Sequence, residues 1–218
     1  MGGARMLADV QGLHAGLPCL VLGSGPSLNS APSIPDGYIR IALSSACKHG
    51  PYEYFYTADA RHTQKDYWGQ VQASNRPLFV LRHLEGAPYG YYHKPGLLGV
   101  DVNRIIWFDM KPRGVCCTLL PSELLYASTS DLGASQIAFR MGCSRVVLAG
   151  CDLRFMNGIA HWDDTEPWPE SVASHDLAIL ANAVKEWKYF LGLATTGPVS
   201  SLTPSVLTDL GLVRLEVP

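Results

Sequence analysis

Short apolar runs alternate along the chain with polar loops and with segments of helical periodicity. The runs are rich in β-branched, aromatic and leucine residues, which favours strands buried in a sheet. We expect strands at 17–22, 38–43, 54–57, 78–81, 104–108 and 145–149. The tail, 193–218, predicts a short strand, a helical turn opened by Thr203-Pro204, and a final strand at 212–217.

Two segments carry the spacing of an amphipathic helix. Ala134, Ile137, Ala138 and Met141 recur at i, i+3, i+4 and i+7, which predicts a helix over 132–141 that ends at Gly142. A second helix is expected over 173–191, and its apolar face would comprise Leu177, Leu180, Val184, Trp187 and Leu191. Residues 61–72 also have a helical pattern, less regular than the other two.

Strands that alternate with helices predict an α/β fold, Rossmann-like, with a mainly parallel sheet flanked by helices. With 218 residues the chain suits a single nucleotide-binding domain over 1–218. Two segments do not fit regular structure. The stretch 86–99 is rich in Gly, Pro and Tyr, and its aromatic residues at 86–93 are candidates for stacking on a base or sugar. The polar segment 153–172 predicts a long loop, a candidate lid.

Composition narrows the class of protein. The net charge is −2, so we expect no basic face for nucleic acid, and the apolar runs are too short to span a membrane. The N-terminal residues have no signal-peptide pattern, and the six cysteines include no Cys-x-x-Cys pair, as in reduced cytosolic proteins. We therefore expect a cytoplasmic protein, and its association into a homo-oligomer stays open.

The strongest local motif is Gly23-Ser24-Gly25-Pro26-Ser27, which follows the apolar run 17–22. Two glycines permit a close backbone approach, Pro26 suits a first helical turn, and Ser24 or Ser27 could cap that turn. N–H groups exposed at such a turn attract phosphate. The motif predicts either a nucleotide-binding loop or a plain connection between a strand and a helix.

Other candidates lie where ligands bind in open parallel sheets, beyond the carboxyl ends of the strands. They are Thr129, Ser130 and Asp131 at a helix start, Gly150 and Asp152 at a strand end, and Asp59. Helix-start N–H groups would hold phosphate, and the carboxylate of Asp152 would accept a ribose hydroxyl. Ordinary capping explains the same residues without a ligand.

His175 lies at the expected start of the helix over 173–191, where it could act as a general base. His161, Asp163 and Asp164, with Asp152 upstream, could instead hold Mg²⁺ or Mn²⁺, although their spacing fits no established metal motif, and we assign no metal ligand. No Gly-Lys-Ser/Thr follows the glycines, and there is no Gly-x-Ser-x-Gly elbow.

Three of these segments resemble the small bacterial sialyltransferases of glycosyltransferase family 42 and the related domain-of-unknown-function 115 proteins, which include a 6-hydroxymethylpterin diphosphokinase. The family's Gly-Asn-Gly-Pro-Ser-Leu motif stands here as Gly23 to Leu28. Its Thr-Ser-Gly helix start stands as Thr129-Ser130-Asp131, and its Ser-Gly-x-Asp strand end as 149–152. Phage genomes commonly encode short relatives, and the resemblance extends to a phage protein.

The resemblance implies a glycosyltransferase that moves a sugar from a nucleotide-activated donor, a CMP-sugar, to a hydroxyl acceptor. His175 would be the base, and Arg154 would stand in for the family's tyrosines on the leaving phosphate. No cofactor or metal would be required. The first alternative is a diphosphokinase-like phosphoryl transferase using Mg²⁺. The second, a non-catalytic nucleotide- or partner-binding protein, is favoured by the departures Ser24 for Asn and Asp131 for Gly.

Overall fold

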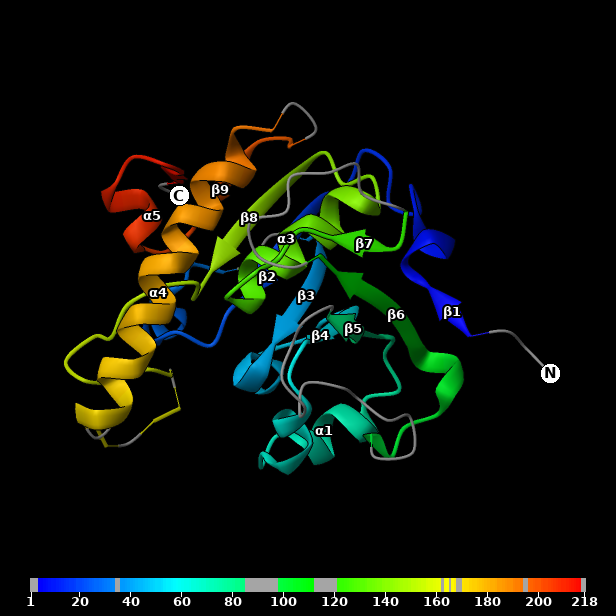
Figure 1. Cartoon of the computed structure of the whole chain (residues 1–218), viewed down its shortest axis with the longest axis horizontal. Coiled ribbons are helices and arrows are strands. Elements are labelled where there is room, and N and C mark those ends of the chain that lie inside the picture. Colours follow the sequence, from blue (N-terminus) through cyan, green and yellow to red (C-terminus); the bar gives the residue numbers. More distant parts are fainter. Residues whose placement is uncertain are drawn as a thin grey trace.

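The computed structural model describes residues 4–33, 36–84, 98–111, 121–161, 163–164, 166–167, 170–193 and 196–216. Figure 1 shows a central sheet with the long helix α4 along one flank, beside α5, and with β1 at the opposite flank. Most of the segment 86–99 lies outside the described residues, as do Cys116 and Cys117.

The strands are β1 (Arg5–Met6), β2 (Pro18–Leu22), β3 (Ile39–Leu43), β4 (Tyr54–Thr57), β5 (Leu78–Leu84), β6 (Ile105–Met110), β7 (Glu123–Leu124), β8 (Arg145–Ala149), β9 (Val199–Ser201) and β10 (Arg214–Leu215). The α-helices are α1 (Trp68–Ala73), α3 (Ser130–Arg140), α4 (Glu170–Leu191) and α5 (Val206–Asp209). Short 3-10 helices are η1 (Leu7–Val10), η2 (Pro26–Ser30), η3 (Ser44–Lys48), η4 (Ala60–Gln64) and η5 (Val102–Arg104).

The ten strands form one sheet in the order β1-β6-β5-β4-β3-β2-β8-β9-β10, and β7 pairs with β6. Every pairing between these described strands is parallel, which confirms the predicted α/β fold with a mainly parallel sheet. The strand order reverses at β2. From there the chain proceeds through β3 to β6 on one side, and β8 to β10 lie on the other. Reversals of this kind create the crevice in which doubly wound folds bind ligands.

The central strands are buried on both faces, so they are apolar at every position rather than at alternate ones. In β2, Cys19 and Val21 belong to the core beneath α3 and α4, whereas Leu20 and Leu22 belong to a core on the other face. Farther along the sheet, that second face is covered by α1 and η3. The sheet therefore lies between two apolar layers.

Helix α3 forms with the expected face inward, because Ala134, Ile137, Ala138 and Met141 are fully buried. Its C-terminus is a Schellman motif. Gly142, at φ 84°, donates its N–H to Phe139 O at 3.0 Å, and Cys143 N donates to Ala138 O at 3.1 Å. The left-handed backbone at position 142 is the reason that a glycine ends this helix.

Helix α4 begins three residues before its predicted start, and its buried face differs from the predicted one. Trp187 is fully buried with Ala183 and Phe190, but Leu177 is 55% exposed. Among the described side chains of α4, the buried ones lie in the second half of the helix, while Ile179 and Leu180 line a cavity. Among the described helices none is both long and apolar enough to cross a membrane.

Other boundaries also differ from the sequence prediction. The helix expected over 61–72 is divided into η4 and α1, because Lys65 between them has extended backbone and ends η4. The strand expected over 212–217 is shortened to β10. The two-residue strands β1 and β7 were not predicted, since two residues are too few to show a periodic pattern.

Trp187 joins α4 to the core, and its loss should destabilise the fold. The Trp187→Ala variant would leave a large cavity beside Phe190, so we expect the free energy of unfolding to fall by about 3–5 kcal/mol. Urea denaturation would measure the loss. Leu177→Ala, an exposed position on the same helix, is the control and should change stability by less than about 0.5 kcal/mol. Equal losses in the two variants would contradict this packing.

Candidate functional site

Two loops meet at the reversal of the strand order, one after β2 and one after β8. Their backbones are joined directly, because Gly23 N donates to Ala149 O and Gly25 N donates to Gly150 O, both at 2.7 Å. A Cβ on Gly23 would lie 2.4 Å from Gly150 O, and one on Gly25 would lie 2.7 Å from the same oxygen. Both glycines are therefore required by the contact between the loops, whether or not a ligand is present.

Asp152 fixes the turn after Gly25. Its carboxylate accepts hydrogen bonds from Ser27 N at 2.9 Å and from Ser27 Oγ, and the residue is only 2% exposed. Burial raises the pKa of this carboxyl, an effect that the two bonds from Ser27 and the charge of Arg154 partly offset. The structure directs Asp152 at the loop, and acceptance of a ribose hydroxyl by this carboxylate stays a prediction.

The Gly23–Ser27 loop directs three of its N–H groups at the protein itself. The N–H groups of Gly23, Gly25 and Ser27 all donate within the protein, and Pro26 has none. These donors are unavailable to a phosphate. A glycine-rich loop has the same sequence signature whether its N–H groups face a ligand or a neighbouring strand, so phosphate binding by this motif stays a prediction.

The loops border a cavity of about 370 Å³, which is within the usual size range for small-ligand sites. The three segments singled out from the sequence all contribute to it. Its lining residues are Gly23, Ser24, Gly25, Leu43, Ser44, His62, Ser128, Thr129, Ser130, Asp131, Gly150, Cys151, Asp152, Leu153, Arg154, Phe155, Ala160, His161, Ile179 and Leu180. The structure therefore brings these candidate segments together, and their binding roles stay predictions.

The start of α3 supplies the polar wall of this cavity. Thr129 is the N-cap residue, but its side chain makes no capping hydrogen bond. The preceding Ser128 is held by Glu186 of α4, whose carboxylate accepts from Ser128 N at 2.7 Å and from Ser128 Oγ at 2.8 Å. The first N–H groups of a helix have no intrahelical partner and carry a partial positive charge. An anion in the cavity would lie best at this end of α3.

Asp131 lies in the first turn of α3, yet its side chain is buried. Its Oδ2 accepts a hydrogen bond from Trp187 Nε1 at 3.3 Å. Burial raises the pKa of this carboxyl, although Thr129, the first-turn N–H groups and Trp187 oppose the shift. The negative charge expected to oppose phosphate is therefore directed into the core and disfavoured by its surroundings.

The described part of the segment after β8 is tied to neighbouring loops by hydrogen bonds, and its role as a lid stays a prediction. His161 Nδ1 is hydrogen-bonded to Ser24 Oγ at 2.9 Å, and Asp164 Oδ2 accepts from His161 N at 2.8 Å. Asp163 Oδ1 accepts from Ser45 Oγ at 2.7 Å, after β3. The candidate metal ligands are thus divided among separate partners. Within the described residues, no three His, Cys, Asp or Glu side chains form a group that could hold a metal ion.

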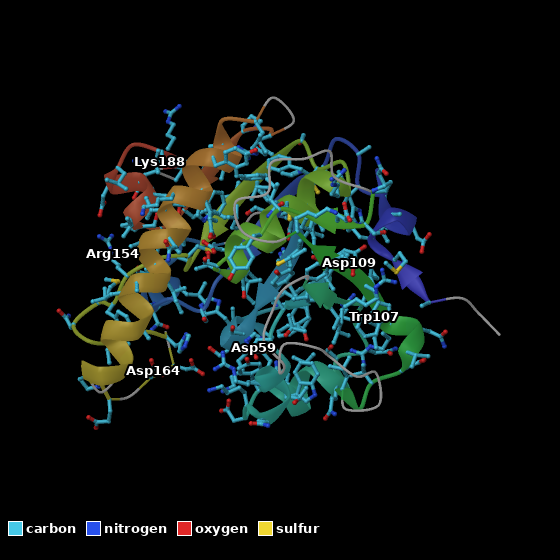
Figure 2. All side chains as sticks on the ribbon, in the orientation of Figure 1. Asp59, Trp107, Asp109, Arg154, Asp164 and Lys188 are labelled. Carbon is cyan, nitrogen blue, oxygen red and sulfur yellow. The ribbon has the colours of Figure 1, made fainter. Side chains whose placement is uncertain are left out.

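Arg154 lines the cavity but is drawn toward α5, where its Nη1 pairs with Asp209 Oδ2 at 2.5 Å. The two side chains are 33% and 55% exposed, and pairs this exposed contribute little to stability. In Figure 2, Arg154 and Asp164 lie on the side of the molecule that α4 occupies, and Asp59 lies nearer the middle.

Asp59 belongs to an adjoining cavity of about 240 Å³ rather than to the first. It caps η4 by accepting from Arg61 N at 2.8 Å, and its carboxylate also pairs with the guanidinium of Arg61. Burial alone would raise the pKa of Asp59, but the hydrogen bonds from Arg61 outweigh burial and lower it.

His62, which was not predicted from the sequence as a site residue, lines both cavities. Its position just beyond the end of β4 was the signal available.

His175 lies in the second turn of α4, because the helix begins at Glu170. The side chain of His175 lies outside the described residues.

No protein-family model and no curated protein matches the chain, so the link to domain-of-unknown-function 115 stays a prediction. Solved structures do match its fold. The sialyltransferase CstII from Campylobacter jejuni, in complex with cytidine-5'-monophosphate, matches with TM-score 0.51 and 12% identity over 92% of this chain and 85% of that chain. CstII in complex with CMP-3FNeuAc matches with TM-score 0.50 and 12% identity, over 91% and 86% of the two chains.

The MAf glycosyltransferase from Magnetospirillum magneticum AMB-1 matches with TM-score 0.49 and 13% identity, over 99% of this chain but 38% of that chain. The chain therefore has the α/β fold of the sialyltransferase over most of both lengths. At 12% identity this likeness establishes the fold alone, so any chemistry has to be argued from the residues of the site.

The buried carboxyl of Asp131 should make stability depend on pH. Because its pKa is raised on folding, the native state binds the proton more tightly than the unfolded state, so stability is lost as the pH rises above the unfolded value of about 3.9. Asp131→Asn keeps an oxygen for Trp187 Nε1 and does not titrate. We expect the stability of the variant relative to the wild type to increase as the pH rises above about 4, measured by urea denaturation. A difference that is constant with pH would contradict a raised pKa.

Proposed function

We propose that the chain is a glycosyltransferase that moves a sugar from a CMP-sugar to a hydroxyl acceptor. The observation that carries the proposal is the cavity at the reversal of the strand order, which has the uncapped start of α3 in its wall. The shared fold supports it, because the matched sialyltransferase holds cytidine-5'-monophosphate or CMP-3FNeuAc.

The donor phosphate would lie at the start of α3. There the first-turn N–H groups and the hydroxyl of Ser130 supply donors, and the helix dipole favours a negative charge. The loop after β2 would contribute Ser24, while its glycines hold the loop against β8. In this arrangement the glycine motif shapes the site and α3 binds the charge.

In the transfer step the acceptor oxygen bonds to the anomeric carbon of the sugar as the bond from that carbon to the phosphate oxygen breaks. The electron pair of the broken bond stays on CMP, whose phosphate carries the developing charge. The acceptor proton passes to His175, the proposed base. Arg154 contributes positive charge at the rim of the cavity, although its pairing with Asp209 weakens that contribution.

The magnesium-dependent alternative fits the geometry less well. Its ligands would be Asp152 with Asp163 or Asp164, but these carboxylates accept hydrogen bonds from Ser27, Ser45 and His161 respectively. A shared metal would require several of these bonds to break together. Sugar transfer needs no such rearrangement, which is why we place it first.

Nucleotide binding tests the donor half of the proposal. We expect CMP to raise the thermal stability of the protein more than AMP, GMP or UMP at equal concentration, without added metal. At 100 times its dissociation constant the gain is about 2.7 kcal/mol. Thermal shift gives the ranking and calorimetry the affinity. Stabilisation by none of the four nucleotides would reject the proposal, and a dependence on Mg²⁺ would favour the phosphoryl transferase.

His175 tests the catalytic half. A positioned base contributes about 10²–10⁴-fold, so His175→Ala should lower kcat on that scale and leave the dissociation constant for CMP within about twofold. Release of CMP from a CMP-sugar would report turnover. The control is His49→Ala, an exposed histidine at the end of η3, which should keep wild-type turnover. Unchanged turnover in His175→Ala would remove this residue from the mechanism.

A further inference from the structure

The adjoining cavity shares a wall with the first. Both are lined by His62, by Ser128 to Ser130 and by Ile179. The remaining described lining of the second cavity is Tyr56, Ala58, Asp59, Arg61, Leu81, Met110, Tyr126 and Ala127. Two substrates placed in the two cavities would therefore meet at His62 and at the start of α3.

The hydrogen bonds of His62 define its tautomer. Thr57 Oγ1 lies 2.9 Å from His62 Nδ1 and 3.1 Å from the carbonyl oxygen of Asp59. A carbonyl can only accept, so the single hydroxyl proton of Thr57 goes to Asp59 O. The hydroxyl then accepts from Nδ1–H, and the neutral ring carries its lone pair on Nε2. Among the described residues, no hydrogen bond is recorded at Nε2.

His62 remains neutral at physiological pH. Burial lowers the pKa of the imidazole to about 4, against the attraction of Asp59, while Lys65, Arg61 and His161 lower it further. A neutral ring with Nδ1–H engaged offers only an acceptor at Nε2. Its ligand partner must therefore be a donor, and a saccharide acceptor carries hydroxyl donors besides the reacting one, whose proton the proposed function gives to His175.

We propose that the second cavity is the acceptor subsite and binds a saccharide, one of whose hydroxyl groups donates to Nε2 of His62. This inference rests on the proposed function and adds the place and class of its acceptor. The ion pair of Asp59 and Arg61 supports a saccharide, because it places carboxylate and guanidinium atoms on the wall. Sites for sugars need such oriented polar groups beside apolar surface, here supplied by Leu81 and Met110.

The test begins with the resonances of the histidine rings in ¹⁵N-labelled full-length protein. We expect His62 to show the Nδ1–H tautomer without ligand. Methyl galactoside, methyl glucoside and methyl N-acetylglucosaminide are the probes, each titrated with and without CMP. At least one should shift the Nε2 resonance of His62 and leave that of the exposed His49 unchanged. If none of the probes moves His62, or if the ring is an Nε2–H tautomer, the subsite is wrong.

Two variants separate an effect on saccharide binding from an effect on folding. His62→Gln keeps the bulk of the side chain but loses the oriented acceptor, so the dissociation constant of the responsive saccharide should rise about tenfold. CMP affinity should stay within about twofold of the wild type, and His49→Gln is the matched control. If His62→Gln does not fold, Thr57→Val is the second variant. It removes the hydroxyl that fixes the Nδ1–H tautomer of His62, so it should weaken the binding of the same saccharide. Unchanged saccharide affinity in the folded variant would overturn the inference.

The outcomes also separate this inference from the proposed function. CMP binding without a saccharide response at His62 would overturn the acceptor subsite and leave the donor site standing. A saccharide response without CMP binding would reject the CMP-sugar donor and keep the second cavity as a saccharide site.

Discussion

The contact between the loops after β2 and β8 is the constraint on which the rest of the site depends. Neighbouring strands at a reversal of the strand order send their chains to opposite faces of the sheet, so the two loops would otherwise diverge. Two backbone hydrogen bonds from Gly23 and Gly25 hold them together. The buried carboxylate of Asp152 then secures the turn at Ser27, at the cost of burying a charge. The outcome is a cavity floor in which the N–H groups of Gly23, Gly25 and Ser27 are engaged within the protein.

With those N–H groups engaged, the charge on the cavity wall depends on the start of α3 and on the contacts that α4 makes with it. Glu186 of α4 holds Ser128, which sets where the first turn of α3 begins, and Trp187 on the same helix engages the carboxyl of Asp131. The one acidic side chain in that turn is thereby directed into the core. On the proposed function, the partial positive charge at this helix start would face the donor phosphate. Because Glu186 and Trp187 are adjacent in α4, the packing of this helix and the charge at the start of α3 depend on each other.

Much of the architecture could be predicted from the sequence, because buried parallel strands are apolar throughout and their loops carry glycine. The strands at 54–57 and 145–149 match their predicted bounds, and Gly142 ends α3 as expected. The sequence could also indicate which loops gather at one edge of the sheet.

The sequence could not indicate where the N–H donors of these loops point. Whether a glycine N–H faces a ligand or Ala149 O depends on the register between loops, and this contact joins residues more than a hundred positions apart. The same limit hid His62, whose tautomer depends on a hydroxyl and a carbonyl brought together by the turn into η4.

On the proposed function, the arrangement of the two cavities also explains why the site has three anchored loops. A transferase must bring two substrates together and exclude water, which competes as an acceptor. The segment after β8 is tied to the loop after β2 by His161 and Ser24, and to the loop after β3 by Asp163 and Ser45. These ties lie around the first cavity, whereas the second is bordered by β4, β5 and β6. A donor enclosed on one side of His62 and an acceptor entering from the other would meet at the start of α3, where the leaving phosphate is stabilised. Any loosening of the β2–β8 contact would separate these elements before it unfolded the sheet, so activity should be more sensitive than stability to changes in that contact.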